Sequence, residues 1–93
     1  MNELESYRQE IDAVDQELTR LFEKRLETVL KVGEYKKKHQ LPVLDADREK
    51  KVIEKNIARL RNTDFQEEVT MFYKAIMNIT KQTQERFMEK EEE

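Results

Sequence analysis

The sequence predicts an all-α protein of three helices, in which the first helix is much the longest. Three observations lead to this fold class: charged residues make up 42% of the 93 residues, the chain has one glycine and one proline, and apolar residues recur at helical spacing. Strands joined by tight turns need many glycines and prolines. A small all-β fold is therefore excluded, and long amphipathic helices remain.

The first helix is expected over residues 3–38. Apolar side chains follow one another along this stretch at alternating intervals of three and four residues, which is the heptad spacing of a helix that packs on another helix. Three lysines end it, where the helix dipole favours cations. The positions of this heptad seam are Leu4, Tyr7, Ile11, Val14, Leu18, Leu21, Arg25, Thr28, Val32 and Tyr35.

The second helix is expected over residues 46–61, after an extended connection. Pro42 has no backbone N–H and disfavours a helical conformation at Leu41, so the first helix cannot continue through this point. Asp45 or Asp47 can then cap the new helix by accepting hydrogen bonds from its first backbone N–H groups. Apolar residues at helical spacing follow, so we expect one face of this helix to be buried.

The third helix is expected over residues 64–89. Thr63, followed three residues later by Gln66, matches the capping box that begins many helices. A second heptad of apolar residues starts at Phe65. Residues 89–93 are lysine and glutamate only, and we expect this acidic tail to fray because it has no apolar side chain to bury.

The length of the first helix predicts a dimer. A helix over residues 3–38 spans about 54 Å at 1.5 Å per residue, whereas a compact chain of this size has a radius of gyration of about 12 Å. The two shorter helices cannot cover so long a seam. We therefore expect a single-domain chain that forms an obligate helical homodimer with its long helices antiparallel.

Composition excludes several kinds of site and partner. The chain has no cysteine and one histidine, which rules out thiolate chemistry and a histidine-rich metal site. Its net charge of −3 gives no basic excess for nucleic acid. The first residues lack the features of a signal peptide, and no apolar run approaches the length of a membrane span. We expect a cytoplasmic protein without metal, cofactor, nucleic-acid or membrane partner.

Arg25 is the anomaly of the first helix because it occupies a seam position among apolar residues. A buried guanidinium is costly unless it is paired, so either a carboxylate of another helix or an anionic ligand should face it. Lys36 lies on the same face about 16 Å farther along, as a solvated lysine or as part of an anion clamp. Arg8, about 25 Å away in the other direction, is a surface arginine unless it reaches the ligand of a partner subunit.

Two further groups of candidate residues lie on the later helices. Asp45, Asp47 and Glu49 form part of a calcium-loop pattern but lack its glycine and its full ligand set, so we do not expect a metal there. Thr80 and Gln84 share a face of the third helix beside its seam, as ordinary boundary residues often do. Considered one at a time, each of these residues has a structural explanation.

Five motifs that contain these residues occur in order along the chain: Arg8-x-x-Ile11-Asp12-x-x-Asp15, Arg25, Val32-Gly33-x-x-Lys36, Pro42-Val43-x-Asp45-x-x-Arg48-Glu49 and Ile76-x-x-x-Thr80-x-x-x-Gln84. Together they resemble the all-α class of chorismate mutases. The resemblance covers residues 4–86, nearly the whole chain. One departure is Thr80, where many members have serine, but the hydroxyl is kept.

The resemblance implies a stand-alone, monofunctional isomerase that converts chorismate to prephenate for phenylalanine and tyrosine biosynthesis. This Claisen rearrangement moves no proton and needs no nucleophile or metal, which suits the composition. It does need a dianion held in a compact conformation, and stabilisation of the negative charge that grows on the breaking ether oxygen. The fold of this family, an intertwined dimer of three-helix chains, agrees with the argument from helix length.

The resemblance also implies a role for each cation and for the amide. Arg25 and the partner subunit's Arg8 would bind the two carboxylates of the substrate. Lys36 and Gln84 would donate hydrogen bonds to the ether oxygen, which makes Lys36, Gln84 and Arg25 the expected catalytic residues. The substrate would then be the counter-ion that explains a guanidinium on an apolar seam.

The remaining candidates would hold the rest of the substrate, again by resemblance. Glu49 and the backbone near Asp45 would bind the ring hydroxyl. Arg48 would orient these acidic groups, and Thr80 would complete the pocket. All of these roles concern substrate binding, and none of them involves a metal or a cofactor.

Two other functions remain open at this point. Isochorismate pyruvate lyase shares this fold and much of the cationic pocket, and these residues do not separate the two substrates. A non-catalytic helical dimer that regulates a partner enzyme is the other alternative. Such a scaffold would have no use for Arg25 on a seam together with Lys36, Arg48 and Gln84, and no pathway-enzyme partner follows from the sequence.

Overall fold

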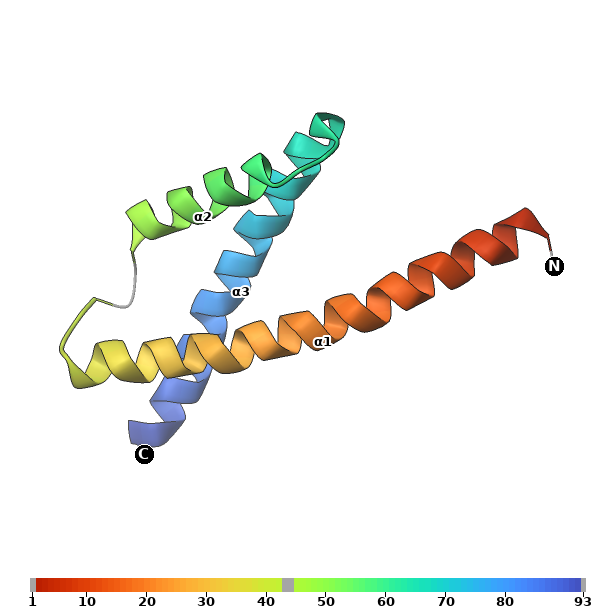
Figure 1. The fold of residues 1–93 in the computed structure, drawn as a ribbon. Helices are drawn as coiled ribbons and strands as arrows, with labels where there is room; N and C mark the ends of the chain where they lie inside the picture. The colour runs from red at the N-terminus through yellow and green to blue at the C-terminus, as the bar shows by residue number, and fades with distance from the viewer. Residues whose placement is uncertain (1, 43–44, 93) are drawn as a thin grey trace.

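The computed structural model of the protein describes the backbone of residues 2–42 and 45–92, with side chains up to residue 87. No β-strand occurs within these ranges. The predicted all-α fold with a long N-terminal helix is therefore confirmed. Its elements are α1 (Glu3–Lys38), α2 (Ala46–Ala58), the short 3-10 helix η1 (Thr63–Phe65) and α3 (Gln66–Glu92), shown in Figure 1.

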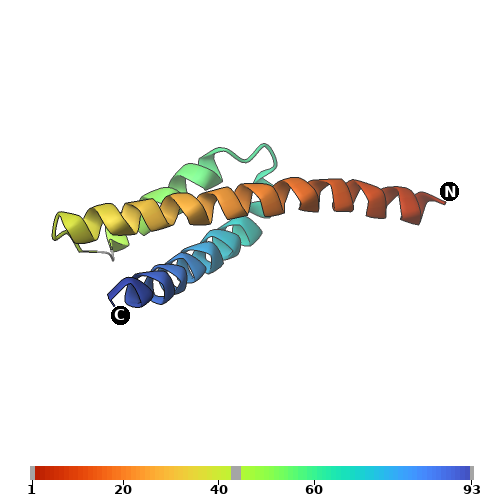
Figure 2. The ribbon, with the colours of Figure 1, turned by 90° about the horizontal axis from the view of Figure 1, so that it is seen from below.

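Helix α3 is the element on which the other two helices pack. Both α1 and α2 contact it, and the C-terminal half of α1 crosses the C-terminal half of α3 (Figure 1, Figure 2). The N-terminal half of α1 projects beyond the other helices, so the chain measures 55 × 28 × 14 Å. Its radius of gyration is 16.7 Å, against about 12 Å for a compact chain of this length. One chain does not enclose its longest helix.

Local hydrogen bonds cap both ends of α1. The side chain of Asn2 accepts a bond of 2.8 Å from a first-turn backbone N–H. At the other end, the N–H of Leu41 donates to the carbonyl of Lys36 (2.7 Å), and that of Gln40 donates to the carbonyl of Lys37 (3.2 Å). This is a Schellman motif. It places Gln40 at φ 57°, in the left-handed region that glycine adopts at lower cost.

Helix α2 begins at a side-chain cap and ends three residues before the predicted end at 61. Asp45 accepts a hydrogen bond of 3.0 Å from the N–H of Arg48, so Asp45, of the two candidates, is the cap. The last α-helical residue is Ala58, because the next two N–H groups bond to carbonyls only three residues back. Residues 43–44 of the connection before α2, which include the motif residue Val43, lie outside the described residues.

Helix α3 begins differently from the prediction. The side chain of Asn62 accepts a bond of 3.0 Å from the N–H of Asp64, so Asn62, and not Thr63, caps the turn. Such a bond to the residue two positions on makes a tight turn, which is why the 3-10 helix η1 precedes α3. The α-helix then continues to Glu92, through most of the tail expected to fray, since glutamate and lysine are strong helix formers. Glu93 lies outside the described residues.

The apolar interior of the single chain is small. Among the described residues, the buried apolar side chains are Ile76 and Met77 of α3, and Gly33 is buried on α1. The seam of the projecting half of α1 is instead 45–62% exposed. A row of large apolar side chains in water marks an interaction surface. Its members are Leu4, Tyr7, Ile11, Val14, Leu18 and Leu21.

Candidate active site

A cavity of about 180 Å³ lies where α1, α2 and α3 meet. Seven of the eight residues that the sequence analysis selected line it. The eighth, Arg8, lies on the exposed projecting half of α1 and is not brought to the cavity within one chain. The seven are Arg25 and Lys36 from α1, Asp45, Arg48 and Glu49 from the start of α2, and Thr80 and Gln84 from α3.

Helix α1 forms one wall of the cavity because its four lining residues share a face. Arg25, Val29, Val32 and Lys36 are spaced by four, three and four residues, which returns each side chain to the same side of a helix with 3.6 residues per turn. Arg25 and Lys36 stand at the two ends of this row, and the two valines lie between them. The wall is therefore cationic at its ends and apolar in the middle.

Arg25 is half-buried and bonds across to α3. Its Nη1 donates a hydrogen bond of 2.9 Å to the hydroxyl of Thr80. Within the described ranges no carboxylate forms an ion pair with it, so the structural salt bridge considered from the sequence is not formed there. The guanidinium has five N–H donors, and a neutral hydroxyl cannot balance its charge. The arrangement leaves an oriented cation facing the cavity.

Gln84 is the most buried polar residue of the site, with 7% of its surface exposed. Its Nε2 donates a hydrogen bond of 3.1 Å to the backbone carbonyl of Val29 on α1. Gly33 is one turn farther along α1 and is buried. Because glycine has no Cβ, the carbonyl one turn earlier stays accessible to a neighbouring helix. The close approach of α3 to α1 explains why a glycine occurs inside a long helix. The hydrogen bond to Val29 fixes the orientation of the Gln84 amide.

The first turns of α2 form the third wall. Asp45, Arg48, Glu49 and Val52 line the cavity at spacings of three, one and three residues, so they lie on one face of the helix. The cap by Asp45 orients the N-terminal end of α2, where the helix dipole favours negative charge. Two carboxylates thus flank the site without making it anionic, because Arg48 lies among them.

The side chains that line the cavity favour an anion. Four are cationic and two are carboxylates, so the formal charge of the lining is +2, equal and opposite to that of a dicarboxylate. Among the described residues, no cluster of histidine, aspartate and glutamate could hold a metal ion. In the same ranges, no helix is long and apolar enough to cross a membrane. The site can bind and polarise an anion through the N–H and O–H donors of its lining.

Lys81 is a lining residue that the sequence analysis missed. It follows Thr80 directly and precedes Gln84 by three residues, and it lines the cavity as the fourth cation. Its i, i+3 spacing from Gln84 places it near the same helix face, but an exposed lysine has no feature in the sequence that marks it as a site residue. The apolar lining residues Val29, Val32, Val52 and Met77 were not selected either, since apolar residues on helix faces are usually core residues.

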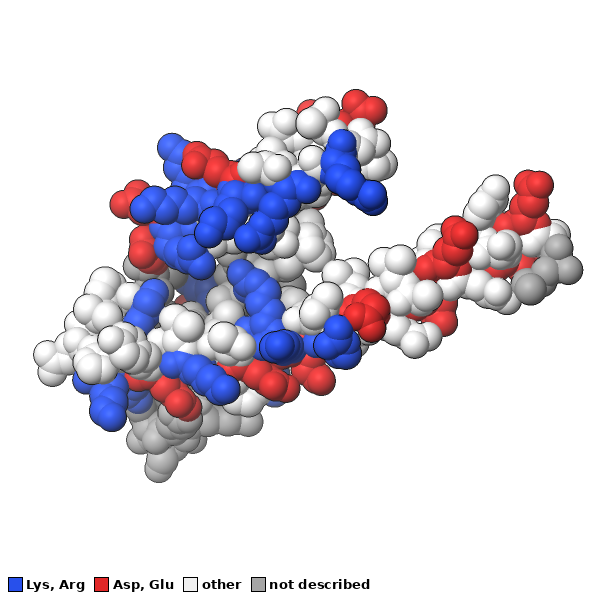
Figure 3. Space-filling view, viewed as in Figure 1, with Lys and Arg blue, Asp and Glu red and all other residues white. Residues whose placement is uncertain are grey.

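Charge is divided unevenly over the molecule, as Figure 3 shows. Lysine and arginine gather over α2 and the neighbouring part of α1, whereas the projecting half of α1 carries mainly acidic side chains. Residues 3–17 contain six acidic residues and a single basic one, Arg8. The cavity therefore lies in a basic body from which an acidic arm extends.

Comparison with known proteins gives a family and several longer relatives. The family described as "Chorismate mutase type II" matches residues 7–85. A "Bifunctional chorismate mutase/prephenate dehydratase" from Aquifex aeolicus is 35% identical over 83 residues, covering 84% of this chain and 23% of that protein. One of the same description from Buchnera aphidicola is 32% identical over 91 residues, covering 96% of this chain and 23% of that protein.

A third relative matches more closely over a shorter segment. The "T-protein" of Haemophilus influenzae is 49% identical over 49 residues, which is 53% of this chain and 13% of that protein. The chain thus spans less than a quarter of the length of each of these curated relatives. The family match nevertheless includes α2, most of α1 and α3, and all eight candidate residues. The chain belongs to the chorismate mutase type II family, and residues 7–85 form the family's domain.

Proposed function

We propose that the protein is a cytoplasmic homodimer that converts chorismate to prephenate in aromatic amino acid biosynthesis. We propose further that this 93-residue chain performs the reaction without the additional length that its relatives have. The observation that carries the proposal is the cavity in which seven selected residues meet with a formal charge of +2. Chorismate is a dicarboxylate, so its charge is equal and opposite to that of this lining.

The chemistry asks for positioning and electrostatics rather than for a reactive side chain. The rearrangement is intramolecular: one C–C bond forms while the C–O bond of the ether breaks, and no proton is transferred. A site that holds the two reacting ends close together removes most of the entropic barrier. Donors fixed around the ether oxygen lower the barrier further, because negative charge grows on that atom in the transition state.

Arg25 binds one carboxylate of the substrate in this mechanism. Its hydrogen bond to Thr80 holds the guanidinium in place before the substrate arrives, so little side-chain freedom is lost on binding. The remaining N–H groups match the two oxygens of a carboxylate in parallel. The role of Thr80 is thus to position Arg25, and a serine would do the same through its hydroxyl.

Lys36 and Gln84 stabilise the ether oxygen. The Nε2 of Gln84 has two N–H donors, and one of them is used by the carbonyl of Val29. That bond fixes the plane of the amide and leaves the second N–H for the substrate. Lys36 lies on the α1 wall, at the end opposite Arg25. The ammonium of Lys36 and the amide of Gln84 can therefore converge on one atom from different helices.

Glu49 and Asp45 bind the ring hydroxyl from the start of α2. The hydroxyl donates a hydrogen bond to the carboxylate of Glu49, and the backbone near Asp45 offers a second polar contact. Arg48, between them in sequence, offsets their charge so that they do not repel the dianion. These contacts fix the ring, whereas the contacts from α1 and α3 act on the carboxylates and the breaking bond.

The second substrate carboxylate is bound by the partner subunit's Arg8. The exposed seam of the projecting arm needs an apolar partner, and the arm's acidic surface complements the basic body around the cavity of a second copy (Figure 3). When each arm lies across the other body, the arm's single basic residue can reach a site from which its own chain keeps it about 25 Å away. The dimer thus supplies the missing cation.

The experiment that tests this function is a direct product analysis. Purified 93-residue chain is incubated with chorismate and, separately, with isochorismate, and the products are identified by chromatography and mass. Prephenate from chorismate supports the proposal. Salicylate with pyruvate from isochorismate would assign the chain to the lyase reaction instead, and no product from either substrate would refute catalysis by this chain.

A further inference from the structure

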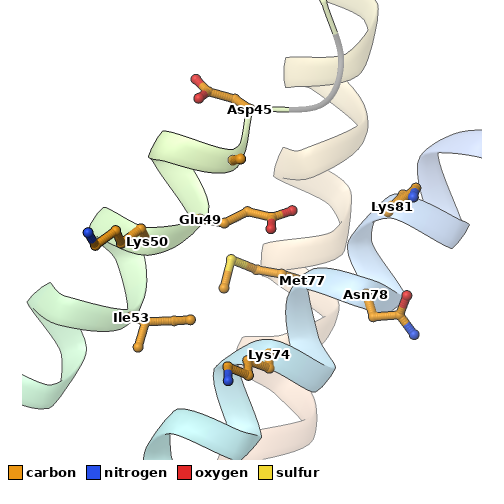
Figure 4. A pocket seen from close by; sticks show the side chains of 9 residues that line it. Asp45, Glu49, Lys50, Ile53, Lys74, Met77, Asn78 and Lys81 are labelled. Carbon is orange, nitrogen blue, oxygen red and sulfur yellow. The ribbon is translucent and has the colours of Figure 1, made fainter.

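A second hollow adjoins the cavity on the other side of α2 and α3. It has a volume of about 540 Å³ and lies in the groove between these two helices, with α1 behind them in the view of Figure 4. Four residues line both spaces: Asp45, Glu49, Met77 and Lys81. These residues therefore mark the boundary between the cavity and the outer hollow, which we call the partition.

The outer hollow has an apolar floor and cations at its rim. Ile53 of α2 and Met77 of α3 extend toward each other across the groove, and Lys74 and Lys81 flank it along α3 (Figure 4). Asp45 points away from the groove in the same view, and its side chain is held by the N–H of Arg48. On the α3 side, an anion in this hollow would therefore meet Lys74 first and then Lys81 at the partition.

We propose that Lys81 binds a carboxylate of the dianionic substrate and that the substrate reaches the cavity through the outer hollow. This inference rests on the proposed function. Lys81 is exposed and faces both spaces, so one ammonium group can attract the anion outside and keep a contact with it inside. Met77, an unbranched and adaptable side chain, lies beside it in the partition and can move aside without breaking a polar contact.

The proposed dimer favours this route. An arm that brings the partner subunit's Arg8 to the cavity would lie across the side between α1 and α2. The groove between α2 and α3 opens on the side away from α1 (Figure 4). Lysines along that groove raise the local concentration of a dianion, since a charged cleft focuses the electrostatic field.

The first test replaces Lys81 by glutamine. The contact is to a substrate carboxylate that does not change charge during the reaction, so its loss weakens substrate and transition state alike. We expect KM for chorismate to rise about tenfold, with kcat within about twofold of the native value. Lys81→Arg keeps the charge and should restore KM. An unchanged KM would overturn the inference, and so would a fall in kcat at constant KM.

The second test concerns the approach through the outer hollow. Lys74 lines only the outer hollow, whereas Lys31 is an exposed lysine of α1 that lines neither space. We expect Lys74→Glu to raise KM about threefold at low ionic strength, with the effect disappearing near 0.5 M salt because of screening. Lys31→Glu, which changes the net charge equally, should have a much smaller effect. Equal effects of the two variants would refute the route.

The outcomes separate this inference from the function on which it rests. If the native chain does not convert chorismate, the proposed function fails and the inference fails with it. If the native chain is active but the Lys81 and Lys74 variants have native KM values at low salt, only the inference fails. Circular dichroism and sedimentation of each variant verify that fold and assembly are unchanged; all three lysines are exposed, so we expect both to be preserved.

Discussion

The two halves of α1 share one heptad spacing but lie in different surroundings. In the N-terminal half, residues 3–21, the seam is apolar and exposed. In the C-terminal half, residues 22–38, the helix packs on α3, buries Gly33 and places Arg25 against Thr80. One half is complete within the chain, and the other half is not.

This difference shows what a periodic sequence specifies. The repeat of three and four residues determines that α1 is a helix with one face to bury, and it is equally regular in both halves. The partner of each half is encoded in the residues that depart from the repeat. Arg25 and Gly33 mark the half that meets α3 and forms the site, whereas Arg8 is the single basic residue among the acidic residues 3–17.

The largest expected effect comes from the two arginines, one in each half of α1. Arg25→Ala and Arg8→Ala should each lower kcat/KM about 10³-fold, since each removes the guanidinium that binds one substrate carboxylate. A heterodimer with one chain of each variant should have about half the native activity, because one of its two sites keeps both arginines. The measurement is the rate of chorismate loss after the two variants are unfolded together and refolded.

No recovery in this mixture, with heterodimers detected by native mass spectrometry, would show that each site is built from one chain. Arg20→Ala is a matched control for arginine loss. Arg20 lies on the same helix and pairs with Glu17 at 2.7 Å on the exposed surface, and such pairs contribute little to stability. This variant should keep native activity.

Gln84→Glu tests the contact between the C-terminal half of α1 and α3. At neutral pH the new carboxylate would repel the charge that grows on the ether oxygen, and we expect a loss of about 10²–10³-fold in kcat/KM. Burial disfavours the charged form and raises the pKa of a carboxyl, so activity should increase as the pH falls from 8 to 5 and the group becomes a donor. The native amide has no such ionisation.

The measurement is kcat/KM against pH for both proteins, within the range in which circular dichroism shows them folded. Gln84→Leu serves as the control, since it removes the amide without adding an ionisable group. Its activity should be low at every pH. A Gln84→Glu profile parallel to the native one would mean that residue 84 is not beside the breaking bond.

A seam substitution tests the projecting half. Ile11→Asp puts a charge on the exposed apolar row, and we expect the dissociation constant of the dimer to rise about 100-fold, because an unpaired charge would be buried at the interface. Thr19→Asp adds the same charge on α1 outside the seam and should leave assembly unchanged. Sedimentation equilibrium measures both. A native-like Ile11→Asp dimer would place the interface elsewhere.

The smallest effect concerns the turn that ends the C-terminal half. Gln40 adopts φ 57°, and glycine is the residue that this position of a Schellman motif prefers. Gln40→Gly should raise the free energy of unfolding by about 0.5–1 kcal/mol, measured by urea unfolding at fixed protein concentration. Gln40→Ala keeps the Cβ and therefore the steric cost of a positive φ, so it should not raise the free energy of unfolding. Equal stabilities of the two variants would contradict this explanation.

Sequence reasoning identified Arg25 because its chemistry conflicts with its position, and it identified the other candidates through the order and spacing of the five motifs. The sequence alone shows a guanidinium on an apolar seam and a lysine on the same face. It also shows an amide one helical turn from a hydroxyl. The sequence does not identify the four apolar lining residues or Lys81, because a valine on a helix face or an exposed lysine occurs in the same pattern whether or not it lines a site. Their role depends on which faces meet, and that is tertiary information.

The helix ends show the same division. Pro42 and the helical spacing placed the breaks between helices, because they act through the backbone alone. The details depend on competing hydrogen bonds of similar strength. The side chain of Asn62 accepts a hydrogen bond from the N–H of Asp64 and thereby begins a 3-10 turn. The neighbouring Thr63 matched the capping-box pattern, which the chain does not use. Such choices differ by little free energy, so pattern alone does not decide them.

The two hydrogen bonds that tie α1 to α3 have a consequence for folding. Both Arg25–Thr80 and Val29–Gln84 join residues 55 positions apart, so neither can form until a loop of that length has closed, at an entropic cost of about 3–4 kcal/mol. The cavity therefore exists only after the last helix has docked, and a partly folded chain has no site. Any dianion that binds the cavity consequently binds the native state alone, and by mass action it should raise the melting temperature with its concentration.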